Sequence, residues 1–136
     1  MEKVTKFLED NTECTIATCA DDKPRASIVG YVMIEGNLIF ATDPDSIKAN
    51  NLNVNNKISL SICRMPQFVV VDGTTADPTD KEKDTYNKVM FERSPELKQA
   101  VETGEMHPFH YYKLVPEIAY YNDYSNGMGP AEIIKI

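Results

Sequence analysis

Residues 37–60 read NLIFATDPDSIKANNLNVNNKISL, a stretch that combines two strand patterns with a short helix pattern between them. The apolar run Leu38-Ile39-Phe40 leads into a polar turn, and an alternating strand pattern resumes at Lys57. Between the strands, Ser46 is a hydroxyl residue suited to cap a helix, and Lys48 falls in the first turn of that helix. The stretch therefore predicts a strand, a capped helix and a second strand in close succession.

The start of this helix has two interpretations. A hydroxyl, free backbone N–H groups and a cation at a helix N-terminus favour a bound phosphate, because the helix dipole and the unpaired donors both attract an anion. The alternative is an ordinary capped surface helix with a solvated lysine. On this stretch alone both interpretations remain open.

Length and composition predict one soluble globular domain over residues 1–136. A chain of this length can bury roughly two thirds of its unfolded surface, and a composition of 42% hydrophobic and 26% charged residues is typical of globular proteins. No apolar run is long enough to span a membrane, and no charged-then-apolar leader follows Met1. We therefore expect a cytoplasmic protein with no membrane partner.

Charge, cysteine and histidine content argue against a nucleic-acid-binding protein and against a metal site. The net charge of −7 argues against a nucleic-acid partner, which would require a basic surface to displace counterions. Cys14, Cys19 and Cys63 lack metal-type Cys-x-x-Cys spacing, and their odd number predicts reduced thiols. His107 and His110 have no nearby cysteine or carboxylate cluster, so we expect no metal site.

The remaining patterns surround residues 37–60 with further strands and helices. A short amphipathic helix is predicted near the N-terminus, and two helices separated by Ser94-Pro95 are predicted within residues 79–104. Gly73 indicates a bulge in a long fifth strand, and Pro116 interrupts the last long strand. The predicted strands cover residues 14–20, 25–34, 37–42, 57–62, 67–76, 110–122 and 132–136. This order favours a barrel with attached helices over a doubly wound sheet.

Several short patterns occur in an order that resembles the flavin-binding split-barrel family that includes pyridoxamine 5′-phosphate oxidase. They are PRxxxV at 24–29, FxT at 40–42, SxKxxNL at 46–52 and the glycine-containing strand FVVVDGTTA at 68–76. The resemblance covers residues 5–122 and depends on the order of these patterns. It implies a mainly β (α+β) fold, a six-stranded antiparallel split β-barrel with peripheral helices. It also implies a homodimer that holds FMN in two clefts across its interface.

The resemblance implies roles for residues of the second and third predicted strands. Arg25 occupies the position of a basic ligand of the FMN phosphate. Ala26, Ser27 and Ile28 occupy the positions where the strand backbone faces the isoalloxazine ring. Thr42 occupies the strand-end position where a hydroxyl residue meets the flavin.

Further roles fall on the helix and on the fifth strand. Ser46 and Lys48 match the start of the phosphate-binding helix, and Asn51 matches the polar position before the leucine of its pattern. Gln67 matches a glutamine that reaches the flavin ring. A phosphate with nearly two negative charges favours a bidentate arginine and a point-charged lysine, which agrees with these assignments. The alternative for Arg25 is a strand-edge charge that balances Asp21 and Asp22.

The resemblance implies an FMN-binding oxidoreductase or flavin reductase-like protein. It would pass hydride or electrons from a reduced nicotinamide or other donor to a small acceptor, and no side chain is nominated as catalytic acid or base. Ile47 stands where the oxidase has a further cation. This difference leaves open a non-catalytic flavin-binding or sensing dimer, or a split barrel that binds a deazaflavin or a haem-related ligand.

Overall fold

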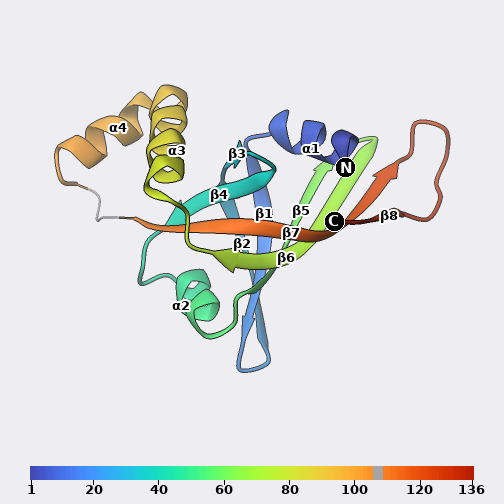
Figure 1. Cartoon of the computed structure of the whole chain (residues 1–136), viewed down its shortest axis with the longest axis horizontal. Helices are drawn as coiled ribbons and strands as arrows, with labels where there is room; N and C mark the ends of the chain where they lie inside the picture. Colours follow the sequence, from blue (N-terminus) through green and yellow to red (C-terminus); the bar gives the residue numbers. More distant parts are fainter. Residues whose placement is uncertain (106–108) are drawn as a thin grey trace.

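The computed structural model describes residues 1–105 and 109–136, and in these ranges one curled antiparallel sheet is surrounded by four helices (Figure 1). None of the described helices is long and apolar enough to cross a membrane. The elements in chain order are α1 (Glu2–Glu9), β1 (Glu13–Ala20), β2 (Lys23–Gly30), β3 (Val32–Ile34), β4 (Asn37–Thr42), α2 (Ile47–Val54), β5 (Lys57–Arg64), β6 (Gln67–Ala76), α3 (Asp80–Arg93), α4 (Pro95–Glu102), β7 (His110–Asp123) and β8 (Glu132–Lys135).

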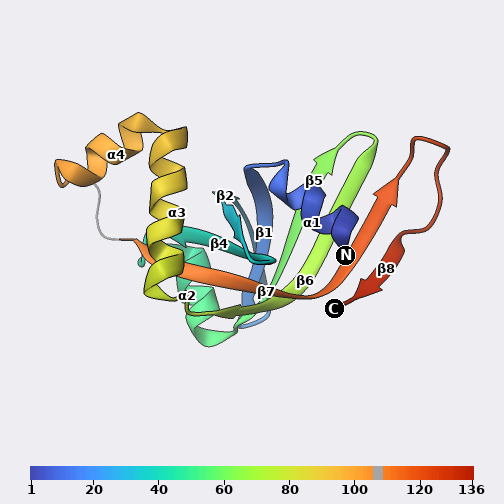
Figure 2. The same cartoon turned by 45° about the horizontal axis from the view of Figure 1, so that its top comes forward.

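The strands form a split barrel in the order β2-β1-β5-β6-β7-β4-β3, with β8 added to β7. Every pairing is antiparallel. One edge of β7 pairs with β6, while the other edge pairs first with β4 and then with β8. The curl of the sheet is clear in Figure 2, where β7 crosses the view and then turns upward alongside β6. This arrangement confirms the mainly β split barrel predicted from the sequence.

The core fills the inside of the curl and is closed at opposite ends by two helices (Figure 1). Val4, Phe7 and Leu8 of α1 enter the core at one end, and Ala49 and Leu52 of α2 enter it at the other. Both helices are short, so their stability depends on this apolar contact more than on helix propensity. The position of α2 is thus fixed by the same core that holds the strands.

Gly73 shows why β6 curves. The β6–β7 register shifts between Asp72 and Gly73, which confirms the predicted bulge. A Cβ atom at Gly73 would lie 2.2 Å from the carbonyl oxygen of Val115, so the two backbones approach too closely for any side chain. The bulge bends both strands and helps the sheet to curl.

Three strand predictions were wrong. In the described residues the sheet has eight strands rather than six. The continuous strand predicted over residues 25–34 is divided into β2 and β3 at Tyr31, because the Tyr31 N–H bonds to the Thr12 carbonyl oxygen and its hydroxyl bonds to the Leu8 carbonyl oxygen. Pro116 does not interrupt β7. On one edge it lies between the segments that pair with β4 and β8, and on the other it faces Gly73 at the bulge, where the ladder is already irregular.

The helices agree closely with their predicted positions. Ser46 caps α2 and Ser94 caps α4, each by accepting a backbone N–H with its hydroxyl oxygen. α3 packs on the outside of β3 and β4, where Tyr86 joins Val32 and Ile39 in a second apolar cluster. α4 follows α3 and projects from the barrel (Figure 1).

Candidate functional site

The end of β4 and the start of α2 meet through two hydroxyl groups. The Ser46 hydroxyl oxygen accepts the Ala49 N–H at 3.3 Å, and it lies 3.2 Å from the Thr42 hydroxyl oxygen. Thr42 is buried, whereas Ser46 is only partly buried. The first backbone N–H groups of α2 have no acceptor within the helix itself. The structure therefore places two hydroxyls and free helix donors at one point.

Arg25 is connected to the same helix through β1. Thr18 of β1 is directly opposite Arg25 in the β1–β2 ladder, so both side chains lie on the same face of the sheet. The Asn51 amide of α2 donates a hydrogen bond of 3.1 Å to the Thr18 hydroxyl. Arg25 is consequently paired with the residue that anchors α2 to the barrel. We call Arg25, Thr42, Ser46 and Lys48 the phosphate site below.

The cations of this site are available to an anion. Arg25 is exposed and Lys48 is partly exposed. The ion pairs within the described residues join Lys3 to Glu132, Lys6 to Asp10 and Lys113 to Glu82, so neither cation is neutralised there. The alternative pairing of Arg25 with Asp21 or Asp22 is therefore not formed in this part of the chain. The positive end of the α2 dipole adds to the attraction.

Ile47 is an exposed apolar residue next to Lys48 in the phosphate site. It is the first residue of α2, next to Lys48, and 52% of its surface is exposed. A cation in this position would have added a further charge for a phosphate. The site thus depends on Arg25, Lys48 and the helix N-terminus.

Ala26, Ser27 and Ile28 lie on an edge strand. β2 pairs with β1 only, which leaves N–H and C=O groups along its other edge without a ladder partner in the described chain. Ile28 is 73% exposed and Ala26 is exposed as well. This edge offers alternating donors and acceptors to a planar polar ring.

Gln67 is not brought to the phosphate site within one chain. Its amide donates to the Tyr121 hydroxyl at 2.8 Å, at the opposite end of the barrel. The register through β5 places it about six residues, or roughly 20 Å, along the strand direction from Thr18. If Gln67 contacts the same ligand as Arg25, it must come from a second copy of the chain.

Two residues that the sequence analysis did not assign to the site also lie in this region. Tyr112 donates to the Ala49 carbonyl oxygen at 3.4 Å, and its ring stacks between Phe40 at 5.3 Å and His110 at 4.6 Å. Burial raises the pKa of Tyr112, and the Asp77 carboxylate raises it further, which keeps the hydroxyl protonated as a donor. The sequence signal was the alternation of β7, which places His110 and Tyr112 on one face. His107 lies outside the described residues.

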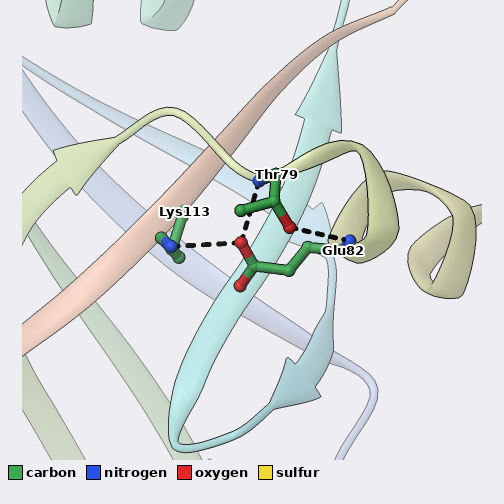
Figure 3. A network of polar contacts seen from close by, with 3 residues as sticks. All are labelled: Thr79, Glu82 and Lys113. Atoms are coloured by element: carbon green, nitrogen blue, oxygen red, sulfur yellow. Dashed lines mark hydrogen bonds and ion pairs between the residues drawn. The ribbon is translucent and has the colours of Figure 1, made fainter.

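A polar network holds α3 against β7 close to this region (Figure 3). Thr79 and Glu82 form a capping box, with bonds of 2.9 Å and 3.1 Å, and the Lys113 ammonium donates to the same Glu82 oxygen at 3.1 Å. The backbone N–H of Thr79 and the neighbouring Lys113 charge lower the pKa of Glu82. This network fixes α3 beside the start of β7, where His110 lies.

Comparisons with known proteins agree with this fold. Three solved structures are similar over most of the chain. A heme-binding protein from Mycobacterium smegmatis has a TM-score of 0.78 and 17% identity, over 98% of this chain and 57% of that one. A FAD-binding protein from Mesorhizobium loti has a TM-score of 0.72 and 18% identity, over 88% and 90% of the two chains. HutZ, a heme storage protein from Vibrio cholerae, has a TM-score of 0.68 and 19% identity, over 85% and 89%.

These identities show a shared fold, and the sequence comparison shows the family. No curated protein matches the chain in sequence. The family model described as pyridoxamine 5′-phosphate oxidase matches residues 1–122, which include every strand from β1 to β6 and nearly all of β7. The chain belongs to the pyridoxamine 5′-phosphate oxidase family.

Proposed function

We propose that this protein is a homodimeric FMN-binding oxidoreductase, similar to a flavin reductase. The observation that carries the proposal is the phosphate site, where the 3.2 Å contact of Thr42 with Ser46 joins a strand end to a capped helix start. Lys48 follows in the first turn of this helix and Arg25 belongs to β2, and neither has a carboxylate partner in the described chain. In a protein of net charge −7, such an uncompensated group of cations fits an anionic ligand.

The β2 edge fits the flavin ring. An isoalloxazine carries N–H and C=O groups along one side, and the free edge of β2 at Ala26, Ser27 and Ile28 presents backbone groups of both kinds. When bound, FMN would supply hydride or electron transfer between a donor and a small acceptor. The residues of the chain bind the phosphate, orient the ring and exclude water from one of its sides.

A second copy of the chain would complete the site. Ile28, Thr15, Ser61 and Val70 stand in register across β2, β1, β5 and β6, so they form one row on the outer face of the sheet. Ile28 and Val70 are exposed apolar side chains in this row. A hollow of about 510 Å³ beside the row is lined in part by Ala17, Pro24 and Ile118. Pairing of two such faces would bury this apolar surface, and it would allow Gln67 of one copy to approach the ring held by the other.

The decisive experiment is a titration of the purified protein with FMN, followed by its visible absorbance spectrum. Arg25→Ala and Lys48→Ala should each weaken FMN binding by about 1.5–3 kcal/mol, because each removes a charge-assisted contact with the phosphate. Lys88→Ala is the matched control, since this exposed lysine of α3 lies outside the site. A protein with no affinity for FMN, or equal affinities in all three variants, would contradict the proposal.

The dimer is tested separately by sedimentation equilibrium. Ile28→Glu places a charge in the centre of the outer row and should give monomers that still fold, because Ile28 is 73% exposed in the single chain. The same variant should bind FMN more weakly. A dimer that persists in Ile28→Glu would show that another face mediates association.

Haem binding is the second candidate function, and two residues favour it. Ile47 provides an apolar surface where a cation would serve a phosphate, and the exposed imidazole of His110 lies opposite Thr42 in the β4–β7 ladder. Imidazole is a common axial ligand of haem iron. Haem added to the wild-type protein should then give a ligated Soret band that His110→Ala lacks. Identical spectra of the two proteins would exclude this role for His110.

A further inference from the structure

A hollow of about 330 Å³ opens at the start of β7. His110 is opposite Thr42 in the β4–β7 ladder, and opposed residues of an antiparallel pair have Cα atoms about 5 Å apart. Thr42 and Ser46 do not line the hollow, but His110 connects it to the end of β4 that carries Thr42. It is lined by Asp77, Pro78, Lys83, Phe109, His110 and Tyr111.

Aromatic rings dominate one side of this hollow. The His110 ring stacks on Tyr112 with centroids 4.6 Å apart and planes inclined by 26°. Because His110 is exposed, the face of its ring that is turned away from Tyr112 remains accessible. Phe109 meets Tyr111 edge to face at 6.5 Å. Because Tyr112 covers one face of the His110 ring and the other face is open, a planar heterocycle can stack on His110.

The hollow is also lined by one positive and one negative side chain, Lys83 and Asp77. The Lys83 ammonium is held 5.6 Å from the centroid of the Tyr111 ring and makes no ion pair within the described residues. It is free to attract a phosphate oxygen. The Asp77 carboxylate can accept a hydrogen bond from an exocyclic amine, as carboxylates do with nucleobases. The hollow thus combines the groups that recognise an amino-substituted base with an attached phosphate.

We propose that this hollow binds the adenylate part of a dinucleotide, with the adenine stacked on His110 and Lys83 directed to the pyrophosphate. The inference rests on the proposed function, because the adenylate would lie beside a flavin whose phosphate occupies the phosphate site. The adenylate has two possible sources with the same chemistry: FAD, in which it continues from the flavin phosphate, and a reduced nicotinamide dinucleotide, which would bind beside FMN.

The first experiment compares dissociation constants of FMN and FAD. If FAD is the source, the wild-type protein binds FAD at least tenfold more tightly than FMN. His110→Ala and Lys83→Met each reduce this preference about tenfold through lost stacking or charge, while FMN affinity stays unchanged. His110→Phe keeps a stacking ring and retains the preference. Lys88→Met, a charge loss elsewhere on α3, has no effect.

The second experiment titrates ADP-ribose, which carries the adenylate and the pyrophosphate but no flavin, into FMN-loaded and flavin-free protein. If ADP-ribose binds to the FMN-loaded protein and His110→Ala weakens this binding, the nicotinamide donor is the source of the adenylate. Binding to a protein that has no affinity for either flavin would refute the proposed function and retain the adenylate site. The adenylate site is refuted if FAD binds no more tightly than FMN and ADP-ribose does not bind. It is also refuted if His110→Ala changes neither the preference for FAD nor the affinity for ADP-ribose.

Discussion

Asn51 of α2 donates a hydrogen bond of 3.1 Å to Thr18 of β1, directly across the ladder from Arg25. The bond connects the helix that begins at Ser46 with the strand that orients Arg25. Thr18 is 2% exposed, so its hydroxyl has little access to solvent. Two parts of the phosphate site therefore share one buried polar contact.

Thr18→Val should loosen this connection while keeping the shape of the side chain. The Asn51 amide would lose its acceptor, and we expect a loss of about 1–2 kcal/mol in the free energy of unfolding, together with weaker FMN binding. Urea denaturation and an FMN titration measure the two effects. Thr12→Val is the control, because Thr12 precedes β1 and its side chain is exposed. Unchanged FMN affinity in Thr18→Val would show that Arg25 and α2 are positioned independently.

Ser46→Ala should lower both stability and ligand affinity. The variant loses the cap of α2, which costs about 1 kcal/mol, and it loses a hydroxyl that would contact the phosphate. Ser94→Ala is a closely matched control, because Ser94 caps α4 with the same 3.3 Å geometry far from the site. Both variants should unfold at lower urea concentration, but only Ser46→Ala should bind FMN about tenfold more weakly. Equal FMN affinities would mean that Ser46 is a cap and nothing more.

Glu82→Gln should remove a pH-dependent part of the stability. Hydrogen bonding to Thr79 and the charge of Lys113 lower the folded pKa of Glu82 below its unfolded value. The stabilisation is therefore fully present above the ordinary carboxyl pKa and is lost as the pH falls through the lower, folded pKa. At pH 7 the variant should be about 1 kcal/mol less stable, and the difference should vanish in acid.

Thermal unfolding between pH 7 and pH 3 measures this difference. Glu92→Gln, an exposed substitution on the same helix, should show no such convergence. A constant difference between wild type and Glu82→Gln at all pH values would assign the effect to packing instead of charge.

Gly73→Ala should be strongly destabilising. The added Cβ would overlap the Val115 carbonyl oxygen, so β6 and β7 would have to separate at the bulge, at a cost of about 2–3 kcal/mol. Gly129→Ala is the comparison, because a Cβ there meets no atom within 4 Å. Chemical denaturation of both variants checks this difference. A stable Gly73→Ala protein would show that the barrel can relax at this point.

Local patterns predicted most elements of this fold. Period-two alternation identified β5, and the serine caps identified the starts of α2 and α4, because these signals depend on neighbouring residues only. The break at Tyr31 was not predicted, since it depends on bonds to Thr12 and Leu8, which are distant in the sequence. The tolerance of β7 for Pro116 was missed for the same reason, as it depends on where β4 and β8 end.

In the candidate site, too, local patterns could be predicted, whereas features that depend on strand pairing could not. The motif order predicted that Arg25, Thr42, Ser46 and Lys48 gather near one helix start. Thr42 and Ser46 are in contact and Lys48 follows in the first turn of α2, while the place of Arg25 beside them stays a prediction. Thr18 carries no signal of its own, and the alternation around His110 does not show which strand lies opposite it, because both depend on strand pairing. The position of Gln67 within one chain could not be predicted without the register of the sheet.

The free edge of β2 also exposes the protein to a hazard. A strand of eight residues with one unpaired edge is a template on which another chain can add a strand, and such pairing leads to aggregation. Lys23, Pro24 and Arg25 interrupt this template, since two positive charges repel a like strand and the proline offers no N–H. In the ligand-free protein, Arg25 would thus oppose aggregation with the same charge that we assign to ligand binding. A ligand bound on this edge would cover the free backbone groups and act as a chemical chaperone.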